Sequence, residues 1–136
     1  MMHVHIYEDC NYYLDDDVFN EIKPGERYLI FGSQESLNGS FYKLSDKYRE
    51  EYGSKTFIGG YLSSHIYPSD VGYIFDIYTH DGGGRLVMRK YYNNFHNLHN
   101  ENGPAHIQLG MGYYYLNGEL LSEKDWGNKM LVKLYW

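Results

Sequence analysis

Residues 72–78 read GYIFDIY and residues 85–92 read RLVMRKYY, and the glycines Gly82, Gly83 and Gly84 lie between them. Both stretches are rich in aromatic and aliphatic residues of the kind that pack well on a pleated, half-buried surface. Glycine permits the positive backbone angles that a tight turn requires. These residues predict an antiparallel β-hairpin at the centre of the fold.

Further strands are predicted on both sides of this hairpin. Residues 105–109 and 112–116 form a second predicted hairpin around Gly110-Met111, and Asn117-Gly118 is a strong turn signal after it. Gly59-Gly60 interrupts a strand pattern and indicates a bulge or a sharp bend there. The other predicted strands are residues 2–7, 27–31, 56–62 and 131–136.

One stretch has the periodicity of a helix. In residues 40–52, SFYKLSDKYREEY, the side chains of Phe41, Leu44 and Tyr48 share one stripe and charges fill the opposite side. A short second helix is predicted at SEKDW, which begins at Ser122. The sequence therefore predicts one α+β domain over residues 1–136. We expect a twisted open antiparallel sheet or half-barrel, with the amphipathic helix packed on it.

Tyrosine is unusually abundant, with 17 in 136 residues. The tyrosines gather in clusters at residues 12–13, 91–92 and 113–115. Consecutive strand residues point to opposite faces of a sheet, so each cluster presents rings on both faces. We therefore expect roughly half of these clustered rings to face solvent.

The charge and the N-terminal residues exclude several classes of protein. The formal net charge is −6, and Arg85, Arg89 and Lys90 form the one cluster of basic residues. This disfavours direct binding to a phosphate backbone. Residues 1–10, MMHVHIYEDC, lack the basic start and apolar core of a signal peptide, and the single cysteine, Cys10, allows no internal disulfide. We expect a cytoplasmic protein without membrane association.

The C-terminal part of the sequence resembles a known repeat. Residues 98–107 read LHNENGPAHI and residues 113–126 read YYYLNGELLSEKDW. Over residues 91–126 this pattern of Gly-Pro-Ala, a strand and aromatic residues before Asn-Gly is similar to the MORN-like hairpin repeats of phage, giant-virus and bacterial proteins. The resemblance implies β-hairpins and a phage or mobile-element origin, and it carries over no catalytic residue. The first 90 residues resemble no family in this way.

The histidines suggest one possible metal site. His96, His99 and His106 are spaced closely enough to share a zinc ion with Glu101. They lie on a loop and a strand without a cysteine partner, so a structural loop is the favoured interpretation. We therefore expect no cofactor.

A binding surface is the main functional hypothesis. We expect a phage or mobile-element protein in the host cytoplasm that binds a host protein or complex, such as a defence complex, and inhibits it without catalysis. A nucleotide sponge, with stacked tyrosines and arginine-bound phosphates, and a histidine-based metal hydrolase are the alternatives. The candidate surface residues are Tyr12, Tyr13, Asp15, Asp16, Asp17, Arg85, Arg89, Tyr91, Tyr113 and Tyr114.

Overall fold

The structure is a computed structural model of the 136-residue chain. It describes residues 4–6, 12–14, 21–29, 36–43, 54–79 and 83–135.

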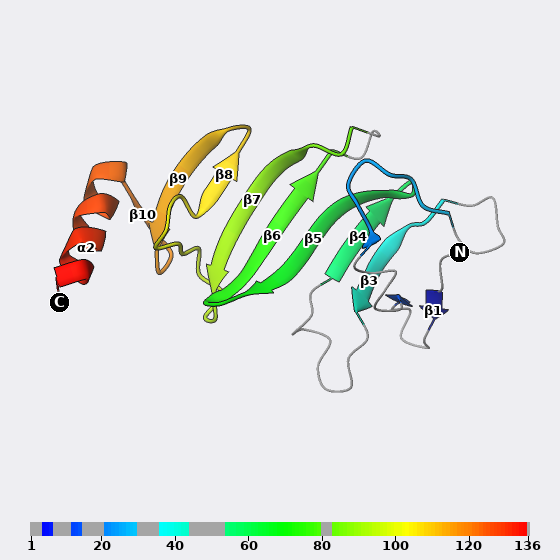
Figure 1. The fold of residues 1–136 in the computed structure, drawn as a ribbon, viewed down its shortest axis with the longest axis horizontal. Coiled ribbons are helices and arrows are strands. Elements are labelled where there is room, and N and C mark those ends of the chain that lie inside the picture. The colour runs from blue at the N-terminus through cyan, green and yellow to red at the C-terminus, as the bar shows by residue number, and fades with distance from the viewer. Residues whose placement is uncertain are drawn as a thin grey trace.

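The described residues form one open sheet whose strands follow each other in chain order (Figure 1). Neighbouring strands pair antiparallel, except that β2 and β3 are parallel. The strands are β1 (Val4–Ile6), β2 (Tyr12–Leu14), β3 (Gly39–Lys43), β4 (Ser54–Ile58), β5 (Tyr61–Ser69), β6 (Gly72–Tyr78), β7 (Leu86–Asn93), β8 (His106–Gln108), β9 (Met111–Leu116) and β10 (Glu119–Leu121). The helix α2 (Glu123–Tyr135) follows β10.

In three of the hairpins, a two-residue turn that contains glycine connects the two strands. The turns are Gly59-Gly60 between β4 and β5, Leu109-Gly110 between β8 and β9, and Asn117-Gly118 between β9 and β10. Both residues of each turn have positive φ, from 50° to 86°. This is the geometry of a type I′ turn, whose twist matches that of the flanking strands.

Strand pairing divides the side chains of β4 to β9 between two faces. Residues paired across an antiparallel ladder project to the same side, and neighbours along a strand project to opposite sides. The buried residues all project to one side, which we call the packed face; they are Lys55, Phe57, Leu62, Asp76, Asn93 and Ala105. The other side, which we call the open face, has no residue in the buried class on β5 to β9.

A short segment before β3 covers one end of the packed face. The ring of Tyr28 meets that of Phe57 edge-on at 5.9 Å between centroids. The backbone N–H of Tyr28 donates to the carbonyl of Gly60 at 2.7 Å, and the N–H of Gly60 donates to Leu37, also at 2.7 Å. Leu37 is 1% exposed, so the apolar core of the described residues is concentrated at this end.

A polar cluster lies at the centre of the packed face. The carboxylate of Asp76, 1% exposed, accepts two hydrogen bonds from Arg89, at 2.7 and 2.9 Å. It also accepts from the hydroxyls of Tyr67 at 3.0 Å and Tyr78 at 3.4 Å. A buried carboxylate is tolerated when it is paired and its oxygens are hydrogen-bonded. This cluster joins β5, β6 and β7.

Two bases continue the row of Asp76 across the sheet. His65 is paired with Asp76 on one side and with Lys55 on the other. Burial lowers the pKa of Lys55 to about 8. Burial, assisted by the charge of Lys55, lowers the pKa of His65 to about 4. His65 is therefore neutral at pH 7, and its ring packs against Tyr67 at 4.6 Å between centroids.

The helix α2 packs at the far end of the sheet. The N–H of Asp125 donates to Oγ of Ser122 at 3.1 Å, which caps the first turn as the sequence indicates. The ring of Trp126 lies 4.9 Å from that of Tyr114, and its Nε1–H donates to the carbonyl of Asn100 at 2.9 Å. Trp126 therefore joins the helix to β9 and to the loop before β8.

The mostly-β α+β class, the open antiparallel sheet and the hairpin of residues 72–92 are confirmed. The second hairpin is also confirmed, with its turn one residue earlier than predicted. Gly59-Gly60 makes a complete turn between two strands, and residues 27–31 contribute isolated bridges at Arg27 and Leu29 within the described part.

The helix predicted from Ser122 is present, whereas the predicted helix over 40–52 and the predicted strand at 131–136 need correction. Residues 40–43 belong to β3, because Ser40 pairs with Thr56 and their hydroxyls are hydrogen-bonded at 3.0 Å. The predicted helix over 40–52 therefore does not begin at Ser40, and residues 44–52 lie outside the described part. The predicted strand at 131–136 is wrong for residues 131–135, because the C-terminal helix continues through Tyr135.

Replacing Asp76 with Asn should lower the free energy of unfolding by about 3 kcal/mol, because Arg89 loses its charged partner on a mostly covered face. Urea unfolding at pH 7 measures this loss. Asp70, which is exposed in the β5–β6 turn, provides the matched control. Asp70→Asn should change stability by less than about 0.5 kcal/mol. If Asp76→Asn and Asp70→Asn lowered the free energy of unfolding equally, the polar cluster around Asp76 would not be important for stability.

The depressed pKa of His65 predicts an acid-sensitive fold. Between pH 6.5 and about 4 the unfolded chain binds a proton at His65 that the folded chain does not bind, so stability falls as the pH is lowered through this window. We expect this residue to account for about 2 kcal/mol of the loss between pH 7.5 and 4.5. Urea unfolding of wild type and of His65→Gln at both pH values isolates the contribution of His65. The other titratable groups contribute equally to the loss of stability in both chains. Identical losses would rule the effect out.

Candidate functional site

The open face carries a row of partly exposed side chains across five strands. Strand pairing aligns Ile66 with Phe75, Phe75 with Lys90, Lys90 with His106, and His106 with Tyr113. Ile66 is 36% exposed and Tyr113 is 39% exposed. The rings of His106 and Tyr113 lie 5.5 Å apart. The row therefore combines aliphatic and aromatic surface with one lysine.

A second aromatic group lies beside this row. Tyr73 and Tyr92 are paired across β6 and β7, and their rings stack at 4.8 Å with an interplanar angle of 13°. The hydroxyl of Tyr73 is hydrogen-bonded to Nδ1 of His96 at 3.2 Å. Stacking between neighbouring strands fixes these rings on regular backbone.

The electrostatics of the open face differ from those of the whole chain. The open-face positions of β5 to β9 include no Asp or Glu, although the chain has a net charge of −6. Burial and the nearby charge of Lys90 lower the pKa of His106, so its ring is neutral at pH 7. Lys90 is therefore the cation at the centre of a neutral aromatic surface.

The predicted surface residues do not gather on one face. Tyr113 lies on the open face, whereas Arg89, Tyr91 and Tyr114 project to the packed face. Arg85 is exposed in the loop before β7, where its backbone N–H donates to Oγ1 of Thr79 at 3.0 Å. The remaining predicted residues are Tyr12 and Tyr13, which belong to β2, and Asp15, Asp16 and Asp17, which lie outside the described residues.

The clustered tyrosines at residues 91–92 and 113–115 are all partly exposed. Tyr91 and Tyr92, like Tyr114 and Tyr115, are partly covered, and Tyr113 falls in the exposed class. They alternate between the faces as expected, but each ring is neither fully buried nor free, because both faces of this sheet are only partly covered. The exposed fraction of a tyrosine therefore does not show on which face of the sheet its ring lies.

The three histidines of the metal hypothesis are held apart by separate contacts. His96 contacts Tyr73, His106 packs on Tyr113, and Nδ1 of His99 accepts the backbone N–H of Asn117 at 3.0 Å. Within the described ranges, no group of three His, Cys, Asp or Glu side chains could hold a metal ion. The geometry of these histidines does not support the metal-hydrolase alternative.

Asparagines hold the loop that carries these histidines. The side-chain oxygen of Asn93 accepts the N–H groups of Phe95 at 2.9 Å and Asn97 at 3.1 Å. The side chain of Asn100 donates to the carbonyl of Pro104 at 3.0 Å. These bonds satisfy backbone groups that a loop otherwise leaves to water. The asparagines of this loop therefore have structural roles.

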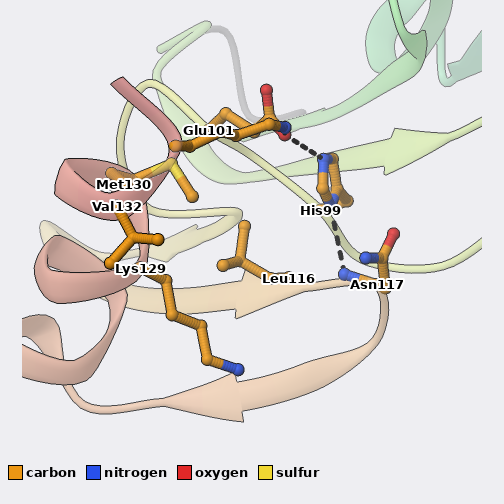
Figure 2. A pocket seen from close by; sticks show the side chains of 8 residues that line it. His99, Glu101, Leu116, Asn117, Lys129, Met130 and Val132 are labelled. Atoms are coloured by element: carbon orange, nitrogen blue, oxygen red, sulfur yellow. Dashed lines mark hydrogen bonds and ion pairs between the residues drawn. The ribbon is translucent and has the colours of Figure 1, made fainter. Parts of the chain in front are cut away.

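A cavity of about 310 Å³ lies between this loop, β9 and α2 (Figure 2). We call it the α2 pocket. One side carries a hydrogen-bonded polar group, in which Nε2 of His99 is 3.6 Å from Glu101 and Glu101 also pairs with Lys133. This pairing with Lys133 lowers the pKa of Glu101. The residues lining the pocket are His99, Glu101, Leu116, Asn117, Lys129, Met130, Val132 and Lys133.

The polar groups of the α2 pocket are already paired with each other. His99 accepts a backbone N–H with one nitrogen, so its other nitrogen carries the proton that faces Glu101. Lys129 lies 3.8 Å from Glu119. Among the described residues, no hydroxyl or thiol lines the pocket, so these residues supply neither a serine nor a cysteine nucleophile.

Comparison of the chain with protein-family models, with curated proteins and with solved structures found no match. Of the helices that the structure describes, none combines the length and the apolar character needed to span a membrane.

The separation of the histidines predicts that zinc does not stabilise the chain through them. With untagged protein, one equivalent of Zn²⁺ should change the thermal midpoint by less than about 1 °C, because only a ligand that binds the folded state raises it. A rise of several degrees that disappears in His99→Gln would restore the metal hypothesis. The same rise in both chains would place the zinc at other residues.

Proposed function

We propose that this chain is a stoichiometric binding protein without catalytic activity and that the open face is its binding surface. The observation that carries the proposal is a continuous set of aromatic and aliphatic side chains, with Lys90 among them, on a face whose positions on β5 to β9 all remain at least partly exposed. Contiguous apolar surface on a protein commonly marks an interaction site.

The open face has the composition of a protein-binding surface. Phe75, Tyr73 and Tyr113 are aromatic residues held on regular strands, so ordering them in a complex costs little conformational entropy. Aromatic side chains are frequent among the residues that dominate binding energy. These features support a partner that lies flat against the sheet.

The charges favour a particular partner surface. Lys90 is surrounded by neutral side chains and faces no carboxylate across the open-face pairs of β6, β7 and β8. A partner with apolar groups and a carboxylate opposite Lys90 complements this face. The resemblance to MORN-like repeats of phage proteins makes a host protein complex, such as a defence complex, the partner that we propose.

The nucleotide alternative has less support in the described residues. It requires a tyrosine and an arginine that converge on one ligand. Tyr113 projects to the face opposite Arg89. Tyr114 shares the packed face with Arg89, but the guanidinium of Arg89 is already bound to the carboxylate of Asp76. The cavity that we describe lies at α2 rather than on the open face.

Charge reversal at Lys90 tests the proposal. Purified wild type should retain a host protein from lysate in near-equal molar amount, as measured by quantitative mass spectrometry. Lys90→Glu should reduce its recovery at least about tenfold, because the new carboxylate opposes the partner's acidic group.

Lys124→Glu is the matched control, because it makes the same charge change at an exposed position on α2. It should leave recovery unchanged. Circular dichroism confirms that each variant is folded. If wild type retains no protein stoichiometrically, or if both variants behave alike, the open face is not the binding surface.

A further inference from the structure

The turn between β8 and β9 contains an unusual residue. Within the described part of the chain, three two-residue turns have positive φ at both positions, and in each the second residue is glycine. The first residue is Gly59, Asn117 or Leu109, with φ of 59°, 50° and 50°. Glycine and asparagine tolerate this conformation, whereas it is strained for a bulky side chain such as leucine. Leu109 is the one that does not fit the turn.

The side chain of Leu109 gains little from packing within the molecule. It is 76% exposed, and the neighbouring Met111 is 62% exposed. We call these two residues the apolar tip. An exposed leucine in a left-handed turn combines backbone strain with apolar surface in water. A contact outside the molecule would recover the apolar part of this cost.

The same chain carries a cavity that suits an apolar side chain. In the α2 pocket, Leu116, Met130 and Val132 provide apolar walls (Figure 2). Val132 is 58% exposed, so the pocket opens to solvent. A cavity of roughly 150 Å³ already accepts a benzene molecule, and the α2 pocket has about 310 Å³. It is therefore large enough for a leucine side chain.

The apolar tip and the α2 pocket cannot meet within one molecule. The tip is at the start of β9 and Leu116 is at its end (Figure 1). Five residues of extended strand separate Met111 from Leu116, which is about 17 Å at 3.3–3.4 Å per residue. The first half of this strand pairs with β8 and its second half pairs with β10, which keeps its two ends apart.

We propose that the apolar tip of one copy of this chain inserts into the α2 pocket of a second copy. The contact is heterologous, because it joins two different surfaces of identical chains. It is small, so the association is weak and depends on protein concentration. This self-association involves neither the aromatic row of the open face nor Lys90, and it does not rest on the proposed function.

Sedimentation velocity between roughly 10 µM and 1 mM tests the proposal, since this range covers weak contacts. Wild type should show a sedimentation coefficient that rises with concentration. Leu109→Asn and Val132→Glu, which alter the tip and the pocket separately, should each remain monomeric throughout. Val71→Asn is the matched control, because it removes an apolar side chain that is 54% exposed in another two-residue turn. This control should associate like wild type.

Mixing the two monomeric variants gives the decisive result. Leu109→Asn keeps an intact pocket, and Val132→Glu keeps an intact tip, so an equimolar mixture should form dimers although neither variant does so alone. Leu109→Asn should also raise the thermal midpoint by a few degrees, since asparagine suits the turn, which excludes unfolding as the cause of its monomeric state. A monomeric wild type at 1 mM, or a mixture that stays monomeric, overturns the proposal.

Discussion

The carboxylate of Asp76 is the group on which the arrangement of the central strands depends. It is almost completely buried, and Arg89, Tyr67 and Tyr78 satisfy its oxygens from three adjacent strands. A thin sheet buries few aliphatic side chains against a second layer, so directional bonds on its surface contribute more to defining strand register. A slip of one residue would turn Asp76 to the open face and leave Arg89 without its partner. The cluster therefore favours one register.

This cluster also explains why the two faces differ. On the packed face, Asp76 and Arg89 are paired with each other, and the lowered pKa of His65 keeps its ring neutral at pH 7. Tyr67 and Tyr78 direct their hydroxyls to Asp76, which leaves their rings as cover for the sheet. The open face, by contrast, presents partly exposed rings that make no bond to a buried charge, and it includes Lys90. The side chains available for binding are therefore those of the open face, which the fold does not use for its own stability.

The sequence predicted the local hairpins well because their signals are local. Alternation, turn glycines and Asn-Gly each act within a few residues, so β6, β7, β9 and the following turn were predictable. The helix expected from Ser40 failed because pairing with Thr56 overrides a periodic pattern over residues 40–43. The end of α2 was missed because LVKLY is compatible with both a strand and a helix.

The binding surface was harder to predict than the fold, because its residues come together only through strand pairing. Tyrosine abundance drew attention to Tyr113 and Tyr114, yet adjacency in sequence places these two on opposite faces. Phe75 and Lys90 carry no motif, and only the pairing of β6 with β7 brings them together. In the sequence, the one indication of this arrangement was Asp76, the single acidic residue within the apolar run GYIFDIY. An aspartate there implies a buried partner, and that partner, Arg89, fixes which side of both strands remains for binding.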